Sequence, residues 1–238
     1  MQTSSVAGSI GFGWETFKKR PWFFVGAMCI VIAANIVVSE VTKALGTHGS
    51  AAFAASVVRV AGSTLIGLGT LAFFLKAHDS VESVSVNDLW HPRLFWKYLG
   101  ATILAGVVIA LAMIPLLLFA LFFGIGAFVS HGASGVILGI AIAMGVACLA
   151  LALFLSSVLV YTPYTVVDRE LGPISALKES ARISKGHRLL IVAMLLSIVL
   201  MNIAGAILFF VGILVSAPVS SLAMVHLYRT LTAPAVSV

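Results

Sequence analysis

Charged side chains are scarce in this 238-residue chain, where Asp, Glu, Lys and Arg together make up 9% of the residues. A soluble domain carries about 25%. No charge of either sign occurs from Tyr98 to Val167, or from Leu189 to Tyr228. These long uncharged stretches exclude a soluble globular protein, whose water-facing surface would need charged residues throughout.

Cysteine is also scarce. The two cysteines, Cys29 and Cys148, both lie in apolar runs, which excludes a secreted disulfide framework. The chain has no nucleophile elbow, no zinc-protease helix motif, no phosphate-binding loop and no paired carboxylates within its apolar runs. We therefore expect no catalytic residues, no metal site and no cofactor, and the chain is predicted not to be an enzyme.

Apolar residues, in contrast, make up 61% of the chain. Because a helical membrane crossing takes about 20 apolar residues, the sequence predicts an all-α polytopic membrane protein with six transmembrane helices in three hairpins. It forms a single membrane domain over 1–238, with spans at about 21–41, 51–76, 98–129, 135–167, 189–206 and 208–231. The last two are separated near Gly205 or Gly212, since one helix would be about twice as long as the membrane is thick. The first run lacks a convincing cleavage site, so it is expected to be retained.

A short segment with aromatic or basic residues precedes each hairpin, at about 8–20, 86–97 and 173–185. In the third segment, Pro173 suits the first helical position and Gly186 a C-terminal cap. Its cations lie in one sector of the helix surface and its apolar residues occupy the rest of that surface. This pattern predicts an amphipathic helix that lies in the headgroup plane of the membrane. The predicted contacts to anionic lipid headgroups are Lys178, Arg182, Lys185 and Arg188, together with Lys18, Lys19 and Arg20.

Basic residues are strongly one-sided in this topology. Twelve flank the spans on the side of both termini, and only Lys43 lies on the other side. Because Lys and Arg near spans stay in the cytoplasm, both termini are predicted to be cytoplasmic, in a bacterial inner membrane. The formal charge of +6 then indicates attraction to anionic lipids of the bilayer and not to nucleic acid. A membrane-protein partner or a second copy of the chain is the other expected partner.

Arg59 lies about eight positions into the second predicted span, away from its ends. A charge at mid-membrane costs at least about 2.5 kcal/mol, so it needs a partner or water. Glu40 ends the first span on the same side, which predicts an intramembrane Arg59–Glu40 ion pair. In the alternative interpretation Arg59 marks a water-filled pathway or binding site. The spans also contain Asn35, Ser63, Ser197 and Asn202, which would either extend a polar interior or make interhelical hydrogen bonds.

Histidine and acidic residues gather in the loop after the second span, which carries His78, Asp79, Glu82, Asp88 and His91. Their spacing matches no metal-ligand pattern, so a solvated loop is predicted. His226, near the end of the last span, is expected to be a hydrogen-bonded packing residue. Small residues four apart, such as Gly135 with Gly139, predict close helix packing.

Two stretches carry motif-like residues. They are Tyr161, Pro163, Asp168, Gly172, Ala176, Leu177, Ser180, Lys185 and Gly186, and then Gly212, Pro218, Tyr228 and Arg229. In these the chain resembles an uncharacterised bacterial family of six-helix membrane proteins, which includes the membrane domain fused to some glycerophosphodiester phosphodiesterases. The resemblance implies a fold and a membrane location but no catalytic residue, because the soluble phosphodiesterase barrel has no counterpart here.

The predicted function is that of an accessory or scaffold protein that organises lipid or a membrane partner. The rival is a small transporter or channel with a polar site around Arg59, and an enzyme acting on lipid comes third. Transport predicts a polar cavity reaching Arg59 and broken helices. A scaffold predicts a dry bundle with an apolar flank.

Overall fold

The computed structural model describes residues 5–46, 48–129, 135–207 and 211–233, and every secondary-structure element in these ranges is a helix. The α-helices are α1 (Val6–Lys19), α2 (Pro21–Leu45), α3 (Gly49–Asp79), α4 (Phe95–Val129), α5 (Gly135–Leu159), α6 (Thr162–Arg169), α7 (Pro173–Ser184), α8 (Arg188–Ile207) and α9 (Val211–Thr232). Two 3-10 turns, η1 (Val86–Leu89) and η2 (Pro92–Leu94), lie between α3 and α4.

Five helical stretches are long and apolar enough to cross a membrane: Pro21–Leu45, Gly49–Asp79, Val86–Pro115, Ile142–Arg169 and Arg188–Ile207. The expectation of an all-helical protein with several membrane-spanning helices is thus confirmed. The sixth predicted span, 208–231, corresponds to α9, which is not among the five. From Ser216 onward most of α9 is buried, because it packs against α1, α3 and α8.

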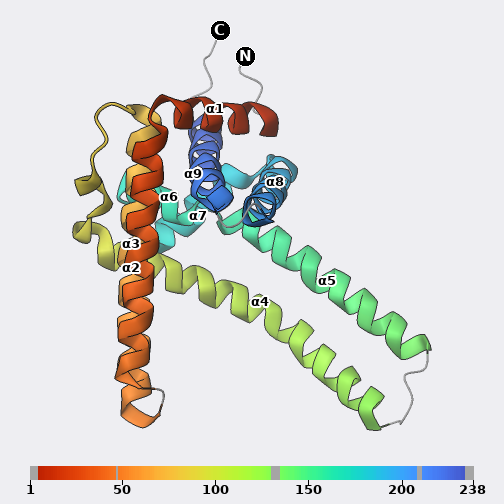
Figure 1. Ribbon diagram of the computed structural model, residues 1–238. Coiled ribbons are helices and arrows are strands. Elements are labelled where there is room, and N and C mark those ends of the chain that lie inside the picture. The colour runs from red at the N-terminus through yellow and green to blue at the C-terminus, as the bar shows by residue number, and fades with distance from the viewer. Residues whose placement is uncertain (1–4, 47, 130–134, 208–210, 234–238) are drawn as a thin grey trace.

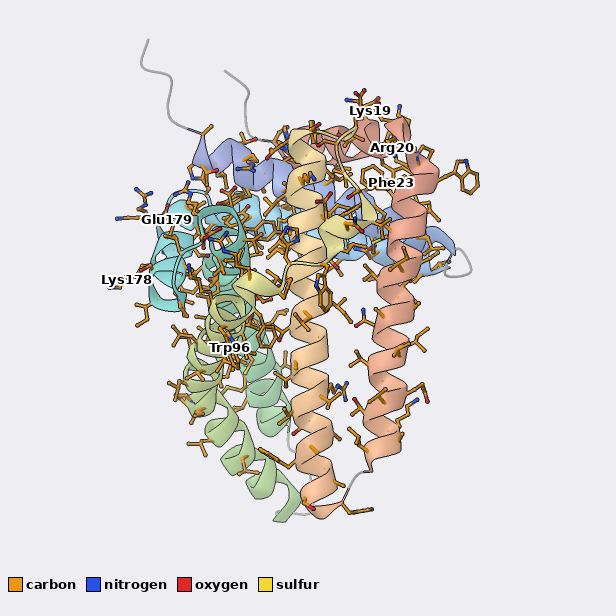
Figure 2. The ribbon with its side chains drawn as sticks, turned by 90° about the vertical axis from the view of Figure 1, so that its left-hand side faces the viewer. Lys19, Arg20, Phe23, Trp96, Lys178 and Glu179 are labelled. Atoms are coloured by element: carbon orange, nitrogen blue, oxygen red, sulfur yellow. The ribbon has the colours of Figure 1, made fainter. Side chains whose placement is uncertain are left out.

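Consecutive long helices pack side by side as the pairs α2–α3, α4–α5 and α8–α9. Figure 1 shows the α2–α3 and α4–α5 pairs diverging from the region where α1, α6 and α7 lie. We call this region the polar end. The ends of the α2–α3 and α4–α5 pairs that lie farthest from it are called the tips. Figure 2 shows the α8–α9 pair running across the upper parts of α2 and α3. The α2–α3 and α4–α5 pairs therefore separate toward their tips, whereas the α8–α9 pair lies at the polar end.

The fourth predicted span, 135–167, is not one continuous helix. It is interrupted at Val160 and Tyr161, between α5 and α6. Pro163 causes the break, because it has no N–H to donate to the carbonyl four residues earlier and its ring crowds that carbonyl. The interruption allows α6 to change direction and to pack against α3, α4 and α7.

The three segments predicted to precede the hairpins differ in structure. α1 covers most of 8–20 and α7 most of 173–185, where Gly186 adopts a positive φ of 88° just after the helix. The segment 86–97 instead forms η1, η2 and the start of α4. η1 rests on α3 at Gly69, where a Cβ would collide with the Leu89 carbonyl.

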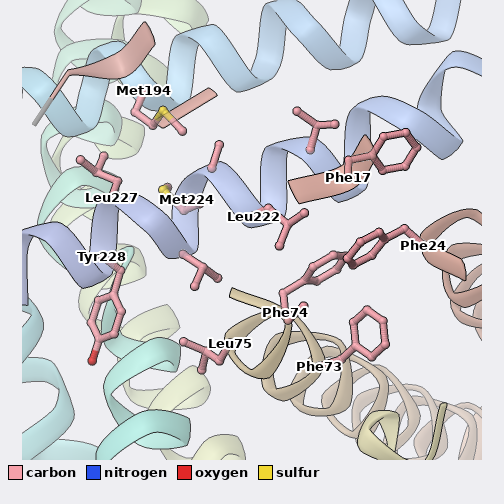
Figure 3. Packing of buried hydrophobic residues seen from close by; sticks show 14 of the residues in the cluster. Phe17, Phe24, Phe73, Phe74, Leu75, Met194, Leu222, Met224, Leu227 and Tyr228 are labelled. Atoms are coloured by element: carbon pink, nitrogen blue, oxygen red, sulfur yellow. The ribbon is translucent and has the colours of Figure 1, made fainter. Parts of the chain in front are cut away.

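The hydrophobic core lies at the polar end, where α1, α2, α3, α8 and α9 meet. α2 and α3 contribute Phe24, Phe73 and Phe74, whose ring centroids are 5.2–6.3 Å apart. Figure 3 shows this aromatic group packed against Leu222 on α9, with Phe17 from α1 beside it. The buried residues are thus concentrated around α9, which becomes the central helix of the core.

Candidate functional site

The predicted Arg59–Glu40 ion pair is not formed. The Glu40 carboxylate accepts a hydrogen bond from Lys43 at 2.7 Å, one helical turn away on α2. Arg59 is exposed, and no ion pair of its guanidinium is found in the part of the chain that the structure describes. Glu40 prefers Lys43 because the i,i+3 spacing on one helix places the two side chains together without distortion.

The predicted headgroup contacts at the start of the first span have different surroundings. Lys19 is exposed, and Lys18 pairs with Glu15 at 2.7 Å. Arg20 is half-buried: its guanidinium lies 4.2 Å from the Phe23 ring centroid and donates to the Val81 carbonyl at 3.1 Å. Figure 2 shows Arg20 and Phe23 together near the top of α2. Arg20 therefore fastens the chain after α3 to α2.

On α7 and beyond, Lys178, Lys185 and Arg188 are exposed. Arg182 is different because it donates two hydrogen bonds to Glu179, which also accepts one from Arg169. The hydrogen bond from Arg182, followed by the charges of Arg182 and Arg169, holds the pKa of Glu179 below its ordinary value. Part of the predicted basic sector is thus neutralised within the protein.

Arg229 on α9 joins two carboxylates from different helices. Its Nη1 donates to Asp168 Oδ1 on α6 and its Nη2 to Asp79 Oδ2 on α3, both at 2.7 Å. The neighbouring Tyr228 hydroxyl donates to the other Asp168 oxygen at 2.9 Å. Both partners are sheltered, since the side chains of Asp168 and Arg229 are 15% and 31% exposed. This group ties together α3, α6 and α9.

Two histidines extend this group toward α1. His78 Nδ1 lies 3.1 Å from Asp79 Oδ1, and His78 Nε2 lies 3.2 Å from His226 Nδ1 on α9. The Phe12 ring stacks on His226 with centroids 4.1 Å apart. We call His78, Asp79, Asp168, His226, Tyr228 and Arg229 together the polar network.

A cavity of about 400 Å³ lies beside the polar network, between α2, α3, the start of α4, α6 and α9. Most of its wall is apolar, and Phe74 and Val225 form part of it. Its polar lining residues are Asn35, Ser63, Thr70, Tyr98, Tyr164 and Ser221. A Cβ on Gly67 would lie 3.2 Å from the Tyr98 hydroxyl, so this glycine leaves room for the Tyr98 ring at the cavity wall.

Arg59 lies one helical turn from the cavity, toward the tip of the α2–α3 pair. Residues four apart on a helix share a face, so Arg59 shares the face of α3 that carries the cavity residues Ser63, Ile66 and Thr70. This face is predominantly polar or small, in contrast to the exposed Val57 and Val58 beside it. Arg59 and the cavity therefore belong to one continuous stripe of α3.

Asn202 makes interhelical hydrogen bonds, as one of the two interpretations of the spans' polar residues predicted. Its amide nitrogen donates to Ser220 Oγ at 3.2 Å, and its oxygen accepts from Ser216 Oγ at 2.8 Å. These bonds join α8 to α9. In the described ranges, no group of three or more His, Cys, Asp or Glu side chains is placed to hold a metal ion.

The prediction of a solvated loop after the second span is wrong for His78 and Asp79, because these two residues end α3 and contact α9. Sequence reasoning also treated Asp168 and Arg229 only as motif-like residues. One feature of the sequence indicates their pairing, because Asp168 and Arg229 are the first charges after the two long uncharged stretches. In a six-span topology both lie on the same side of the membrane, where opposite charges at span ends can meet.

The comparisons assign the chain to an uncharacterised family, as the resemblance predicted in its coarser part. Residues 15–235 match the family described as "Protein of unknown function (DUF975)". The match covers nearly the whole chain, so the chain belongs to this family. No curated protein and no solved structure matches it.

Proposed function

We propose that this DUF975 protein is a non-enzymatic membrane protein that organises lipid, and that it does so by holding one amphiphilic lipid molecule in the cavity between α2, α3, α4, α6 and α9. The cavity is the observation that carries the proposal. Its size falls within the range of about 300–1,000 Å³ that is typical of ligand sites, and its apolar wall with a few polar groups is typical of them too.

The polar lining suits a lipid whose headgroup or ester region enters the cavity. Ser63, Thr70 and Ser221 each donate their hydroxyl proton to a backbone carbonyl of their own helix. Their oxygens can still accept hydrogen bonds, while the hydroxyls of Tyr98 and Tyr164 can also donate. Acyl chains would contact the apolar walls. A dry scaffold bundle would need neither the volume nor the hydroxyl groups.

The polar end is proposed to face the cytoplasm of a bacterial cell, with six spans in three hairpins and both termini inside. In support, most basic residues lie at this end, and Lys43 lies near a tip. Exposed tryptophans also gather near the starts of α2 and α4, where Trp22 and Trp96 are 85% and 78% exposed. Exposed cations and tryptophans together are typical of a membrane interface.

Anionic lipid headgroups are proposed to bind at Lys19, Lys178, Lys185 and Arg188, which stay exposed in the structure. Figure 2 shows the Lys178 side chain extending outward from the edge of the molecule. Each basic residue near an anionic surface contributes about 1 kcal/mol of attraction. Arg182 is expected to contribute less, because Glu179 already neutralises it.

Filling the cavity should weaken lipid binding. We expect Ser63→Phe to lower the affinity for a photoreactive fatty-acyl phospholipid by about tenfold, equivalent to about 1.4 kcal/mol, since the added ring occupies the volume that the lipid needs. The measurement is crosslinking to purified protein in nanodiscs, with the crosslinked residues identified by mass spectrometry. In the parent protein, crosslinks should map to residues lining the cavity.

Ser39→Phe is the matched control, because Ser39 is exposed on α2 and does not line the cavity. This variant should crosslink like the parent protein. Equal crosslinking of both variants, or crosslinks spread evenly over the exposed helix faces, would contradict a lipid site in the cavity.

The side of the membrane on which the polar end lies can be tested independently by cysteine labelling in intact cells. In a chain carrying Cys29→Ala and Cys148→Ala, a cysteine at Ser50, near the tip of α3, should react with an impermeant thiol reagent added outside. A cysteine at Ser80, just after α3, should react only after the cells are opened. Labelling of the Ser80 variant in intact cells would reverse the proposed orientation.

A second candidate function, transport, is favoured by the position of Arg59 on the cavity face of α3 and by the break between α5 and α6. An anionic amphiphile entering along this face would meet Arg59 before the cavity. Transport differs from holding a lipid in one observable respect. It predicts that reconstituted protein moves the bound molecule between the leaflets of a vesicle, and that Arg59→Gln slows this movement.

A further inference from the structure

The contact between His78 and His226 is a junction between two helices that also wall the cavity. His78 lies one turn beyond the cavity residue Phe74 on α3, and His226 follows the cavity residue Val225 on α9. The two imidazoles meet 148 positions apart in sequence. They hold α3 and α9 together at the polar end, beside the cavity.

The hydrogen-bond partners of the pair assign its protons. His78 Nδ1 faces the Asp79 carboxylate, which can only accept, so this nitrogen carries a hydrogen. In the neutral pair, His78 Nε2 is then the acceptor and His226 Nδ1 the donor. The contact tolerates one added proton. His78 then carries a hydrogen on both ring nitrogens, and its Nε2 donates to Nδ1 of His226, which adopts its other neutral tautomer. A second added proton places two N–H groups and two positive charges against each other.

The surroundings do not relieve this conflict. Asp79 is the carboxylate nearest the pair, and Arg229 on α9 already shares it at 2.7 Å. Asp168 on α6 pairs with Arg229 and Tyr228 and has a second cation, Arg169, within 4.0 Å. From α1 the pair meets the Phe12 ring, which stacks on His226 and lies tilted against His78. None of these contacts supplies a separate anion for His226.

We propose that the His78–His226 contact is a proton-sensitive latch that closes the cavity at the polar end. With at most one added proton the pair stays joined and the cavity is shut off from water at this end. When both imidazoles are protonated, α3 and α9 separate and water reaches the cavity between them. The inference uses the cavity of the proposed function, but the latch itself requires no bound lipid.

The test measures water access to the cavity at two pH values. In the Cys29→Ala, Cys148→Ala background, Ser221→Cys places a thiol at the cavity wall, and the protein is held in nanodiscs so that lipid covers its sides. Labelling by an impermeant thiol reagent is compared at about pH 7.5 and about pH 5, on either side of the ordinary histidine pKa. Rates are divided by those of Ser83→Cys, an exposed position, which corrects for the pH dependence of thiol chemistry.

We expect the normalised rate to rise about tenfold at the lower pH, because two charges at this distance repel enough for such a change even when water screens them. His226→Asn should remove the rise, since one histidine alone cannot create the conflict, and His78→Asn tests the same point from α3. His187→Asn, at an exposed histidine outside the pair, should keep the full rise.

A rate that does not change with pH, or a rise that survives in both His226→Asn and His78→Asn, would overturn the latch. Failure of the latch is distinguishable from failure of the proposed function. Lipid crosslinking in the cavity at about pH 7.5 does not depend on the latch opening, and thiol labelling of Ser221→Cys does not depend on a bound lipid.

Discussion

Replacing Arg229 by alanine is expected to lower the free energy of unfolding by about 2–3 kcal/mol, with a fall in melting temperature of about 5 °C or more. Arg229 neutralises two carboxylates at once. Its Nη1 lies 2.7 Å from Asp168 and its Nη2 lies 2.7 Å from Asp79. The largest part of the loss comes from Asp168, because its carboxylate is only 15% exposed and would lose the cation that lies 2.7 Å away. A fully buried pair would lose about 3–5 kcal/mol, and the partial exposure of Arg229 reduces this value.

Arg229→Lys should cause a smaller but still measurable loss. Lysine keeps the charge, but its single ammonium cannot reproduce the planar fork that spans two carboxylates on different helices. Thermal unfolding of the purified protein in nanodiscs measures both variants.

Arg182→Ala is the control, because Arg182 also pairs with a carboxylate but its side chain is 73% exposed. Its loss should be much smaller than that of Arg229→Ala, because an exposed ion pair contributes little to stability and Arg169 continues to pair with Glu179. If Arg229→Ala is no more harmful than Arg182→Ala, the polar network does not hold α3, α6 and α9 together.

Much of the fold follows from hydropathy alone. The start of the first predicted span coincides with Pro21, the first residue of α2, because proline fits the first turn of a helix. The break at Pro163 was within reach of the same reasoning, since a proline inside an apolar run interrupts the helix unless neighbours satisfy the freed carbonyl. Pro115 does lie inside α4, so proline alone does not decide between a break and a continuous helix.

The polar network could not be predicted in the same way. Hydropathy locates helices along the chain but carries no information about which span ends meet, and Asp79 and Arg229 are 150 positions apart. The intramembrane pair of Arg59 with Glu40 failed for a related reason. Opposite charges on neighbouring spans do not pair when a closer partner, here Lys43, lies one turn away on the same helix.

The close packing predicted for Gly139, four residues after Gly135, is not observed, because nothing lies within 4 Å of where its Cβ would lie. Contacts with backbone atoms closer than 3 Å occur instead at Gly13, at Gly69, and between Gly205 and Gly212. Spacing of small residues shows where helices could approach, whereas the actual contacts depend on how the helix pairs diverge from the polar end.

The tight contact at Gly13 leads to the second large expected effect, which is a loss of about 1–3 kcal/mol in Gly13→Ala. A Cβ at this position would lie 2.6 Å from the Val219 carbonyl oxygen and 3.1 Å from the Ala223 nitrogen, both backbone atoms of α9. Backbone atoms of a buried helix cannot move aside, so α1 must shift away from α9. The shift would also weaken the packing of Phe17 in the core and of Phe12 on the histidine pair.

Gly11→Ala is a closely matched control, with the same substitution on the same helix two residues earlier. Nothing lies within 4 Å of a Cβ at Gly11, so only helix propensity changes, and alanine should stabilise α1 by up to about 1 kcal/mol. The two variants are therefore expected to move the melting temperature in opposite directions. Hydrogen exchange should accelerate over α1 in Gly13→Ala alone, because its backbone amides become exposed when the helix leaves α9. If the two substitutions instead have the same effect, α1 does not depend on α9 for its position, and Phe12 could not be held against the histidine pair.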